Sequence, residues 1–250
     1  MISRFCALGI ATLLGATAAF IIPKFRPSTL QVVLLFTGSY LLSITLLHLL
    51  PDLYRQHSCP TQVGLYILIG FLLQLLLCFF SQGLEHGHTY EGLPSKPFDR
   101  QLSPFSLLAS LGIHAFLDGV ILNNAMCTHL HHMHTGHRLL LGISLHKASE
   151  GFALVTVLNK LFQGTKIIIG YVLCFSIASP LGLWLSSYGS QKFLLSIDGL
   201  TALAAIAAGS FLHIATSLFF EATTHHHIQR HQVIAALTGA ILVICLEYLL

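Results

Sequence analysis

Two six-residue motifs combine a histidine, a carboxylate and a glycine at the same spacing. HAFLDG runs from His114 to Gly119, and HKASEG runs from His146 to Gly151. In both, the carboxylate follows the histidine by four residues, and residues four apart lie on one face of an α-helix. Each helix would therefore present an imidazole and a carboxylate in the same direction, a donor set that suits four-coordinate zinc. The motifs predict one metal site with four ligands: His114, Asp118, His146 and Glu150.

The alternative for each motif is structural. A single histidine within a membrane is more commonly a hydrogen-bonded interior residue, and a single histidine–carboxylate pair can be a buried ion pair. Two copies of the pair in consecutive apolar segments favour metal ligation. Lys147 stands about ten residues from either end of its expected helix, too deep for easy contact with the interface. We expect it to pair with Glu150 or Asp118, or to face an aqueous cavity, and not to ligate a metal while protonated.

The composition predicts that lipid surrounds these motifs. Of 250 residues, 54% are hydrophobic and 8% charged, with a mean hydropathy of +0.78, whereas a soluble domain carries about 25% charged residues. Helices satisfy their backbone groups within each segment, which lipid requires. We therefore predict an all-α integral membrane protein, a single domain over 1–250 with the metal site between its fourth and fifth helices. The eight expected transmembrane helices are 5–22, 30–51, 62–82, 103–127, 138–161, 165–186, 194–220 and 232–250.

The distribution of lysine and arginine predicts the orientation. With the amino terminus outside, seven of these residues fall on the cytoplasmic side and four on the other, as the positive-inside rule favours. The expectation is a multi-pass protein of the cytoplasmic (plasma) membrane with both termini extracytoplasmic. A secretory signal over 1–20 is the less favoured alternative, because apolar segments continue to the last residue. The net charge of +3 includes no basic run, so nucleic acid is not an expected partner.

Further histidines and carboxylates lie near the ends of the expected helices, and His213 lies inside the seventh. They are candidates for a pathway that delivers metal to the site and releases it, although solvated helix ends are an equal alternative. The candidates are His48, Asp52, His213, Glu221, His225, His226 and His227. Histidine-rich tracts at 85–88 and 129–137 are expected to bind metal loosely. The six cysteines have no close spacing, which argues against a disulfide framework or thiolate site.

At these motifs the sequence resembles the ZIP (Zrt/Irt-like) family of metal transporters. HAFLDG and HKASEG resemble the paired metal-site motifs on the family's fourth and fifth helices. GSYLLSITLLHLLPDL at 38–53 resembles its second helix, IASPLG at 177–182 its sixth, and AAGSFLHIATSLFFE at 207–221 its seventh as found in bacterial members. The resemblance implies eight helices, extracytoplasmic termini and metal movement into the cytoplasm. It also implies that His114, Asp118, His146 and Glu150 are the primary ligands.

The sequence departs from the pattern of the family's binuclear members. Such members have Asn after the fourth-helix histidine and an acidic residue after the fifth-helix histidine, where this chain has Ala115 and Lys147. Ser179 also stands where they can have glutamate, before Pro180. The resemblance therefore implies a mononuclear site in which Lys147 supplies the missing positive charge. Tyr40 takes the place of a metal-site methionine found in some members, which leaves the second helix's contribution open.

The predicted function is transport of a divalent transition metal rather than enzymatic catalysis. Imidazole and carboxylate ligands suit zinc, iron and manganese, whereas copper(I) prefers sulfur. Zinc is the first choice, with iron, manganese or cadmium as alternatives. The metal is the transported substrate, no cofactor is expected, and a homodimer is left open. The rival functions are an intramembrane zinc-dependent hydrolase, which needs an open coordination position and a base, and a metal sensor that binds without transport.

Overall fold

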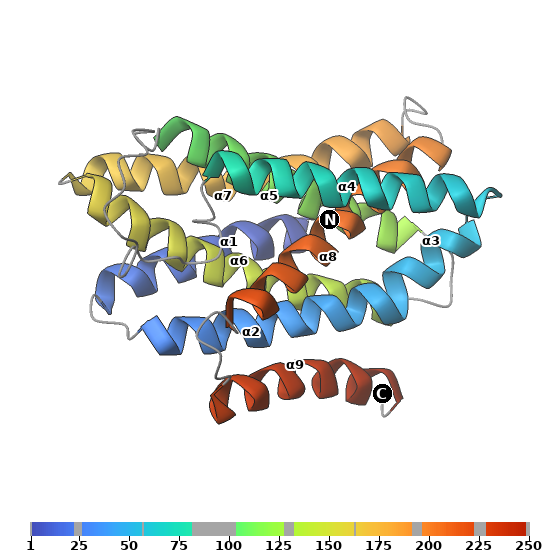
Figure 1. The fold of residues 1–250 in the computed structure, drawn as a ribbon. Helices are drawn as coiled ribbons and strands as arrows, with labels where there is room; N and C mark the ends of the chain where they lie inside the picture. Colours follow the sequence, from blue (N-terminus) through green and yellow to red (C-terminus); the bar gives the residue numbers. More distant parts are fainter. Residues whose placement is uncertain are drawn as a thin grey trace.

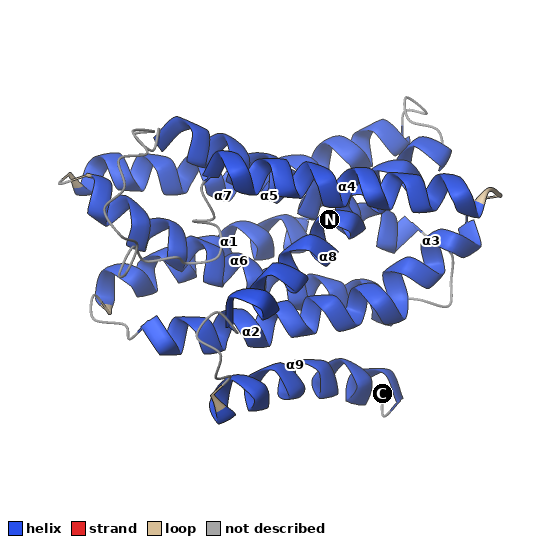
Figure 2. Cartoon of the chain, viewed as in Figure 1, coloured by secondary structure: helices blue, strands red, loops and turns tan. Residues whose placement is uncertain are grey.

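The computed structural model describes residues 2–22, 27–56, 58–81, 104–127, 133–162, 164–191, 197–222 and 229–248. Within these residues every regular element is a helix (Figure 2). Nearly all of these elements are α-helices, and one is a short π-helical turn, η1. In chain order they are α1 (Ile2–Ile21), α2 (Pro27–Ile44), η1 (Thr45–Leu49), α3 (Leu50–Gln56), α4 (Pro60–Ser81), α5 (Pro104–Cys127), α6 (Met133–Leu161), α7 (Thr165–Gln191), α8 (Ile197–Ala222) and α9 (Arg230–Tyr248).

The second expected segment is one helical stretch that passes through a proline. α2, η1 and α3 follow one another without a break, so the stretch ends at Gln56 rather than at residue 51. Pro51 has no backbone N–H, and its ring crowds the carbonyl of Leu47 four residues earlier. The turn before it widens into the π-helical η1, as interrupted helices commonly do. His48 lies in this widened turn. A second boundary also differs: α6 begins at Met133 rather than at residue 138.

Six helical stretches in the described residues are long and apolar enough to cross a membrane. The chain is therefore a multi-pass membrane protein. α6 is not among the six, and α9 qualifies only as a shorter apolar helix, Arg230–Leu246. The six stretches are Ile2–Ile21, Gln31–Gln56, Pro60–Ser81, Pro104–Asn123, Thr165–Gly189 and Asp198–Ser217.

The helices run alongside one another as a bundle, with α9 at one edge against α2 (Figure 1). α6 packs on α1, and α5 packs on α7, which also contacts α1. α8 packs on α4, and α5 contacts both of them. The start of α1 and the end of α9 face the same end of the bundle, at the right of the view. The two motif helices therefore lie inside the bundle with neighbours on several sides.

The motif glycines set the distance from α5 and α6 to their neighbours. A Cβ on Gly151 of α6 would overlap the backbone of α1, and a Cβ on Gly15 of α1 would overlap the backbone of α6. Gly119 of α5 and Gly182 of α7 are related in the same reciprocal way. Small residues let helix backbones approach closely within a membrane. The glycines thus allow close backbone contact of α6 with α1 and of α5 with α7. They do not lie at a contact between α5 and α6.

Candidate metal centre

Five ionisable side chains from α5 and α6 are buried together in the middle of the bundle. His114 and Asp118 come from α5, and their exposed fractions are both 1%. His146, Lys147 and Glu150 come from α6 and are 3% exposed or less. An ionisable group in this environment costs free energy unless it has a partner. The five side chains must therefore compensate one another, or bind a further ion.

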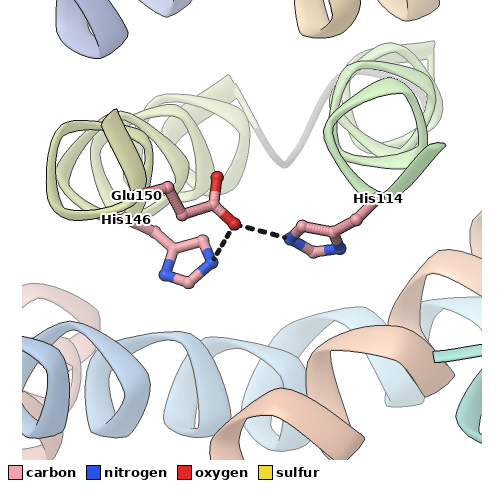
Figure 3. A group of neighbouring side chains, drawn as sticks. All are labelled: His114, His146 and Glu150. Atoms are coloured by element: carbon pink, nitrogen blue, oxygen red, sulfur yellow. Dashed lines mark ion pairs between the residues drawn. The ribbon is translucent and has the colours of Figure 1, made fainter. Parts of the chain in front are cut away.

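One carboxylate oxygen lies between the two histidines. Glu150 Oε1 is 3.1 Å from His114 Nε2 and 3.1 Å from His146 Nε2, and Figure 3 shows both rings turned toward it. The imidazole rings meet edge to face, with centroids 5.8 Å apart. Among the described residues, these three form a group whose ligand atoms all lie within 4.8 Å of one another. The structure therefore brings together three of the four predicted ligands around a common point.

The fourth predicted ligand, Asp118, lies beside this group and contacts a lysine. Its Oδ2 is 3.5 Å from His114 Nε2 and 2.5 Å from Lys147 Nζ. Lys147 Nζ is also 2.5 Å from Glu150 Oε2 and lies 5.2 Å from the centre of the Phe175 ring. The ammonium thus bridges the carboxylates of α5 and α6. The expected pairing of Lys147 with Glu150 or Asp118 is present with both.

The histidine nitrogens at the centre have no hydrogen-bond partner in the described part of the chain. These atoms are His114 Nε2 and both ring nitrogens of His146. A nitrogen lone pair and a carboxylate oxygen repel each other at 3.1 Å unless a proton or a metal ion lies between them. Buried polar atoms without partners are rare and call for an explanation, of which an ion is one.

The spacing fits a transition metal. Zinc bonds to imidazole nitrogen and carboxylate oxygen are about 2.0–2.2 Å long, which places neighbouring ligands of a tetrahedral ion about 3.3–3.5 Å apart. Glu150 Oε1 lies 3.1 Å from both histidine nitrogens. A small shift outward would seat the ion between them. The donor set of two imidazoles and a carboxylate is also the type that zinc prefers.

The remaining predicted residues lie elsewhere or outside the described residues. His48 is buried in η1, and Asp52 pairs with Arg55 at 3.7 Å. His213 of α8 is buried edge-on against Phe71, with ring centroids 4.9 Å apart. None of these joins the His114–His146–Glu150 group found among the described residues. The Glu221 side chain, His225, His226, His227 and most of the two histidine-rich tracts lie outside the described residues.

Two residues at the site were missed by sequence reasoning. Ser210 Oγ lies 3.3 Å from His114 Nδ1 and donates a hydrogen bond to Gln74 Oε1 at 2.7 Å. An amide and a hydroxyl carry no charge and occur in many helices, so their residue types alone do not mark a site. The available indication was Gln74 itself, a polar residue in the middle of the otherwise apolar α4.

Tyr40 proves to be a packing residue. It is fully buried, its ring lies against Gly142, and its hydroxyl donates to the Arg138 carbonyl at 2.9 Å. The tyrosine thus joins α2 to α6 about a turn before His146. It contributes no atom to the group of metal-ligating side chains found in the described residues.

Comparison with curated proteins finds relatives that are similar to part of this chain. The chain is 31% identical over 168 residues to zinc transporter ZIP9 of Micropogonias undulatus, an alignment that covers 64% of this chain and 50% of that protein. It is 31% identical over 162 residues to ZIP9-B of Xenopus laevis and 30% identical over 162 residues to ZIP9 of Xenopus tropicalis, in each case over 62% of this chain and 50% of the relative. Over these residues the chain is similar to proteins named zinc transporters of the ZIP type.

The similarity covers only part of each relative. The chain spans about half the length of the curated relatives it matches. No family model matches it. All three relatives are named zinc transporters and none is named an enzyme; none is bacterial, so the expected likeness to bacterial ZIP members in particular has no support here.

Proposed function

We propose that this chain moves zinc across a lipid bilayer through the buried site between α5 and α6. One observation carries the proposal: two imidazole nitrogens without a hydrogen-bond partner, on different helices, point at the same carboxylate oxygen from 3.1 Å. A divalent cation bound between these three atoms would satisfy all of them. The names of the three relatives favour transport of zinc over other functions, because all three are called zinc transporters. Iron, manganese and cadmium are the alternative substrates that the ligand set admits.

Asp118 completes the proposed ligand set. Its carboxylate lies 3.5 Å from His114 Nε2, so a rotation of the side chain toward the group would add a fourth ligand. That movement requires Asp118 to release Lys147, which it now contacts at 2.5 Å. Metal binding and a change of the Lys147 contacts are therefore coupled in this proposal.

The proposed site is mononuclear. A second ion beside Glu150 would have to share the carboxylate oxygens that the Lys147 ammonium already contacts at 2.5 Å. Ala115 offers no donor atom, and Ser179 offers a hydroxyl in place of a carboxylate. The Lys147 ammonium thus supplies the positive charge that a second metal ion would supply in a binuclear site.

The proposed topology has eight spans. α6 and α9 join the six helices that already qualify, because the charged residues of α6 are buried against neighbouring helices rather than exposed to lipid. An even number of spans places both termini on one side, and the distribution of lysine and arginine puts that side outside the cytoplasm. Metal then enters from outside a plasma membrane and leaves on the cytoplasmic side. We assign His48 and Asp52 to the entrance and His213 to the route. Glu221 and the histidines at 225–227 are assigned to the exit from their positions in the sequence alone.

A hydrolase at the same site is less well supported. It would need a coordination position open to water and a base or acid that is not a ligand. Asp118 and Glu150 both contact the Lys147 ammonium, which disfavours either as a free base. Transport is also the activity for which the relatives are named.

Uptake by vesicles tests the proposal. Purified chain is reconstituted in liposomes, and entry of zinc, iron, manganese and cadmium is followed with an enclosed fluorescent chelator. His146→Ala, which removes one of the two converging nitrogens, should abolish zinc uptake while the protein stays folded by circular dichroism. His137→Ala changes an exposed histidine of the same helix and should leave uptake intact. Normal zinc uptake by His146→Ala would show that the site is misassigned, and binding without flux would select a sensor.

A further inference from the structure

A hydrogen-bonded pair of side chains lies behind His114, on the side away from the proposed metal. His114 Nδ1 is 3.3 Å from Ser210 Oγ, and the Ser210 hydroxyl donates to Gln74 Oε1 at 2.7 Å. Ser210 comes from α8 and Gln74 from α4, whereas His114 belongs to α5. Gln74, Ser210 and His114 are all 1% exposed or less. Water therefore does not compete for these hydrogen bonds.

The direction of these bonds determines which histidine nitrogen holds the proton. A serine hydroxyl has a single hydrogen, and here Gln74 receives it. Toward His114, Ser210 can then only accept, so Nδ1 must carry the hydrogen of the neutral imidazole. In the metal-bound ring the lone pair is then on Nε2, and the ion would lie between Nε2 and Glu150 Oε1, which are 3.1 Å apart. This is the tautomer that a metal ligand needs.

The packing of α4 against α8 brings the pair together. A Cβ on Gly70 would overlap the backbone of Ile206, and a Cβ on Gly209 would overlap the backbone of Ile67. Gln74 follows Gly70 by four residues, and Ser210 follows Ile206 by four. Each side chain therefore lies one helical turn after the Gly70–Ile206 contact, on the face of its helix that makes this contact. The glycine contact thus holds the two side chains within hydrogen-bonding distance.

We propose that Ser210 and Gln74 are positioning residues that hold His114 in its Nδ1-protonated tautomer and aim Nε2 at the metal. The inference rests on the proposed function, since it takes His114 to be a ligand. Hydrogen bonds to the second nitrogen of a ligating histidine fix ring orientation and increase ligand basicity. Because the pair belongs to α4 and α8, it also makes the affinity of the α5–α6 site depend on how those helices sit against α5.

Zinc affinity of paired serine variants tests the inference. Purified chain in nanodiscs is titrated with zinc against a competing chelator. Ser210→Ala should weaken zinc binding about 10–100-fold, the usual effect of losing such a partner. Ser210→Thr keeps the hydroxyl and should stay within about threefold of the original protein. Ser186→Ala is the matched control, because Ser186 is equally buried but donates to the Leu183 carbonyl of its own helix, and it should change nothing.

A spectroscopic measurement separates positioning from general loss of structure. In ¹⁵N-histidine-labelled, metal-free protein, the His114 ring nitrogens are identified by the signals lost in His114→Gln. The original protein should show a hydrogen on Nδ1, with or without a second hydrogen on Nε2 toward Glu150, and Ser210→Ala should lose the Nδ1 hydrogen from part of the molecules. If the Ser210 variants do not fold, two Gln74 variants replace them. Gln74→Met removes the acceptor of the Ser210 hydrogen bond and should behave as expected for Ser210→Ala. Gln74→Glu retains an acceptor and should behave as expected for Ser210→Thr.

The outcomes distinguish this inference from the function on which it rests. Binding by Ser210→Ala within about twofold of the original protein, or equal losses in Ser210→Ala and Ser210→Thr, would overturn the role of the hydroxyl. An unchanged tautomer in Ser210→Ala would do the same. Zinc binding by His146→Ala as tight as in the original protein would instead reject the metal site itself.

Discussion

Replacement of Lys147 by methionine should strengthen zinc binding. Methionine keeps the length and the apolar stem of the side chain but removes the ammonium. In the native protein that ammonium lies 2.5 Å from both Asp118 Oδ2 and Glu150 Oε2. It therefore competes with zinc for the two carboxylates and repels the bound ion. Both effects disappear in Lys147→Met.

The size of the effect follows from the distances. An ion on Glu150 Oε1 and an ammonium 2.5 Å from Oε2 of the same carboxylate are about 5 Å apart, given zinc–oxygen bonds of about 2.0–2.2 Å. A divalent and a monovalent cation at that separation repel by about 1.7 kcal/mol even with the dielectric constant of bulk water. That corresponds to about 15-fold in affinity. Because the site is buried, screening is weaker than in water, so 15-fold is a lower bound.

The metal-free variant should be less stable at the same time. Removal of one partner from a buried ion pair costs about 3–5 kcal/mol, and Lys147→Met leaves two carboxylates without their cation. Zinc should restore the lost stability by binding there. The thermal midpoint of Lys147→Met is therefore expected to fall without metal and to rise with zinc by more than that of the original protein.

Titration with zinc and a scan of thermal unfolding measure both effects in the same nanodisc samples. Lys147→Arg keeps the charge and should bind with nearly the original affinity, while Lys166→Met removes an exposed lysine and serves as the control. The buried site should hold a single zinc ion, counted as the zinc bound by the original protein but not by His146→Ala. Unchanged or weaker zinc binding by Lys147→Met would refute the idea that the ammonium opposes the metal, and two such ions would refute the mononuclear site.

Two further predictions concern packing. Gly119→Ala would place a Cβ against the α7 backbone and should greatly lower the yield of folded protein in detergent. Gly112→Ala is the control, because a Cβ on Gly112 of the same helix would meet nothing within 4 Å. Equal yields of the two variants would contradict the close contact between α5 and α7. Tyr40→Phe removes the hydrogen bond to Arg138 and should cost about 1 kcal/mol of stability without changing zinc affinity. A large loss of affinity in Tyr40→Phe would instead make the second helix part of the metal site.

The helical fold could be predicted from the sequence because lipid restricts the alternatives. Long apolar runs interrupted by polar turns have few structures available other than helices, and the eight expected segments all contain a helix. Boundaries were harder to predict. Pro51 was expected to end the second segment, but a proline can be accommodated inside a membrane helix when the turn before it widens, as η1 does.

The partners of the motif helices could not be predicted from the sequence. The spacing in HAFLDG and HKASEG indicated which side chains share a face, since that depends only on the turn of one helix. It did not indicate that the motif glycines pack against α1 and α7, nor that Asp118 contacts Lys147 more closely than it contacts His114. Those contacts join different segments, so no local pattern encodes them.

The amino-acid sequence is enough to predict that the chain is helical and membrane-embedded, and that two helices each present an imidazole and a carboxylate on one face. These properties follow from composition and from the periodicity of a single helix. The tertiary structure alone decided that Glu150 Oε1 lies between His114 and His146, and that Gln74 and Ser210 stand behind His114. The physical reason is that such contacts depend on how closely separate helices approach, which the glycines permit but which only the packed bundle sets.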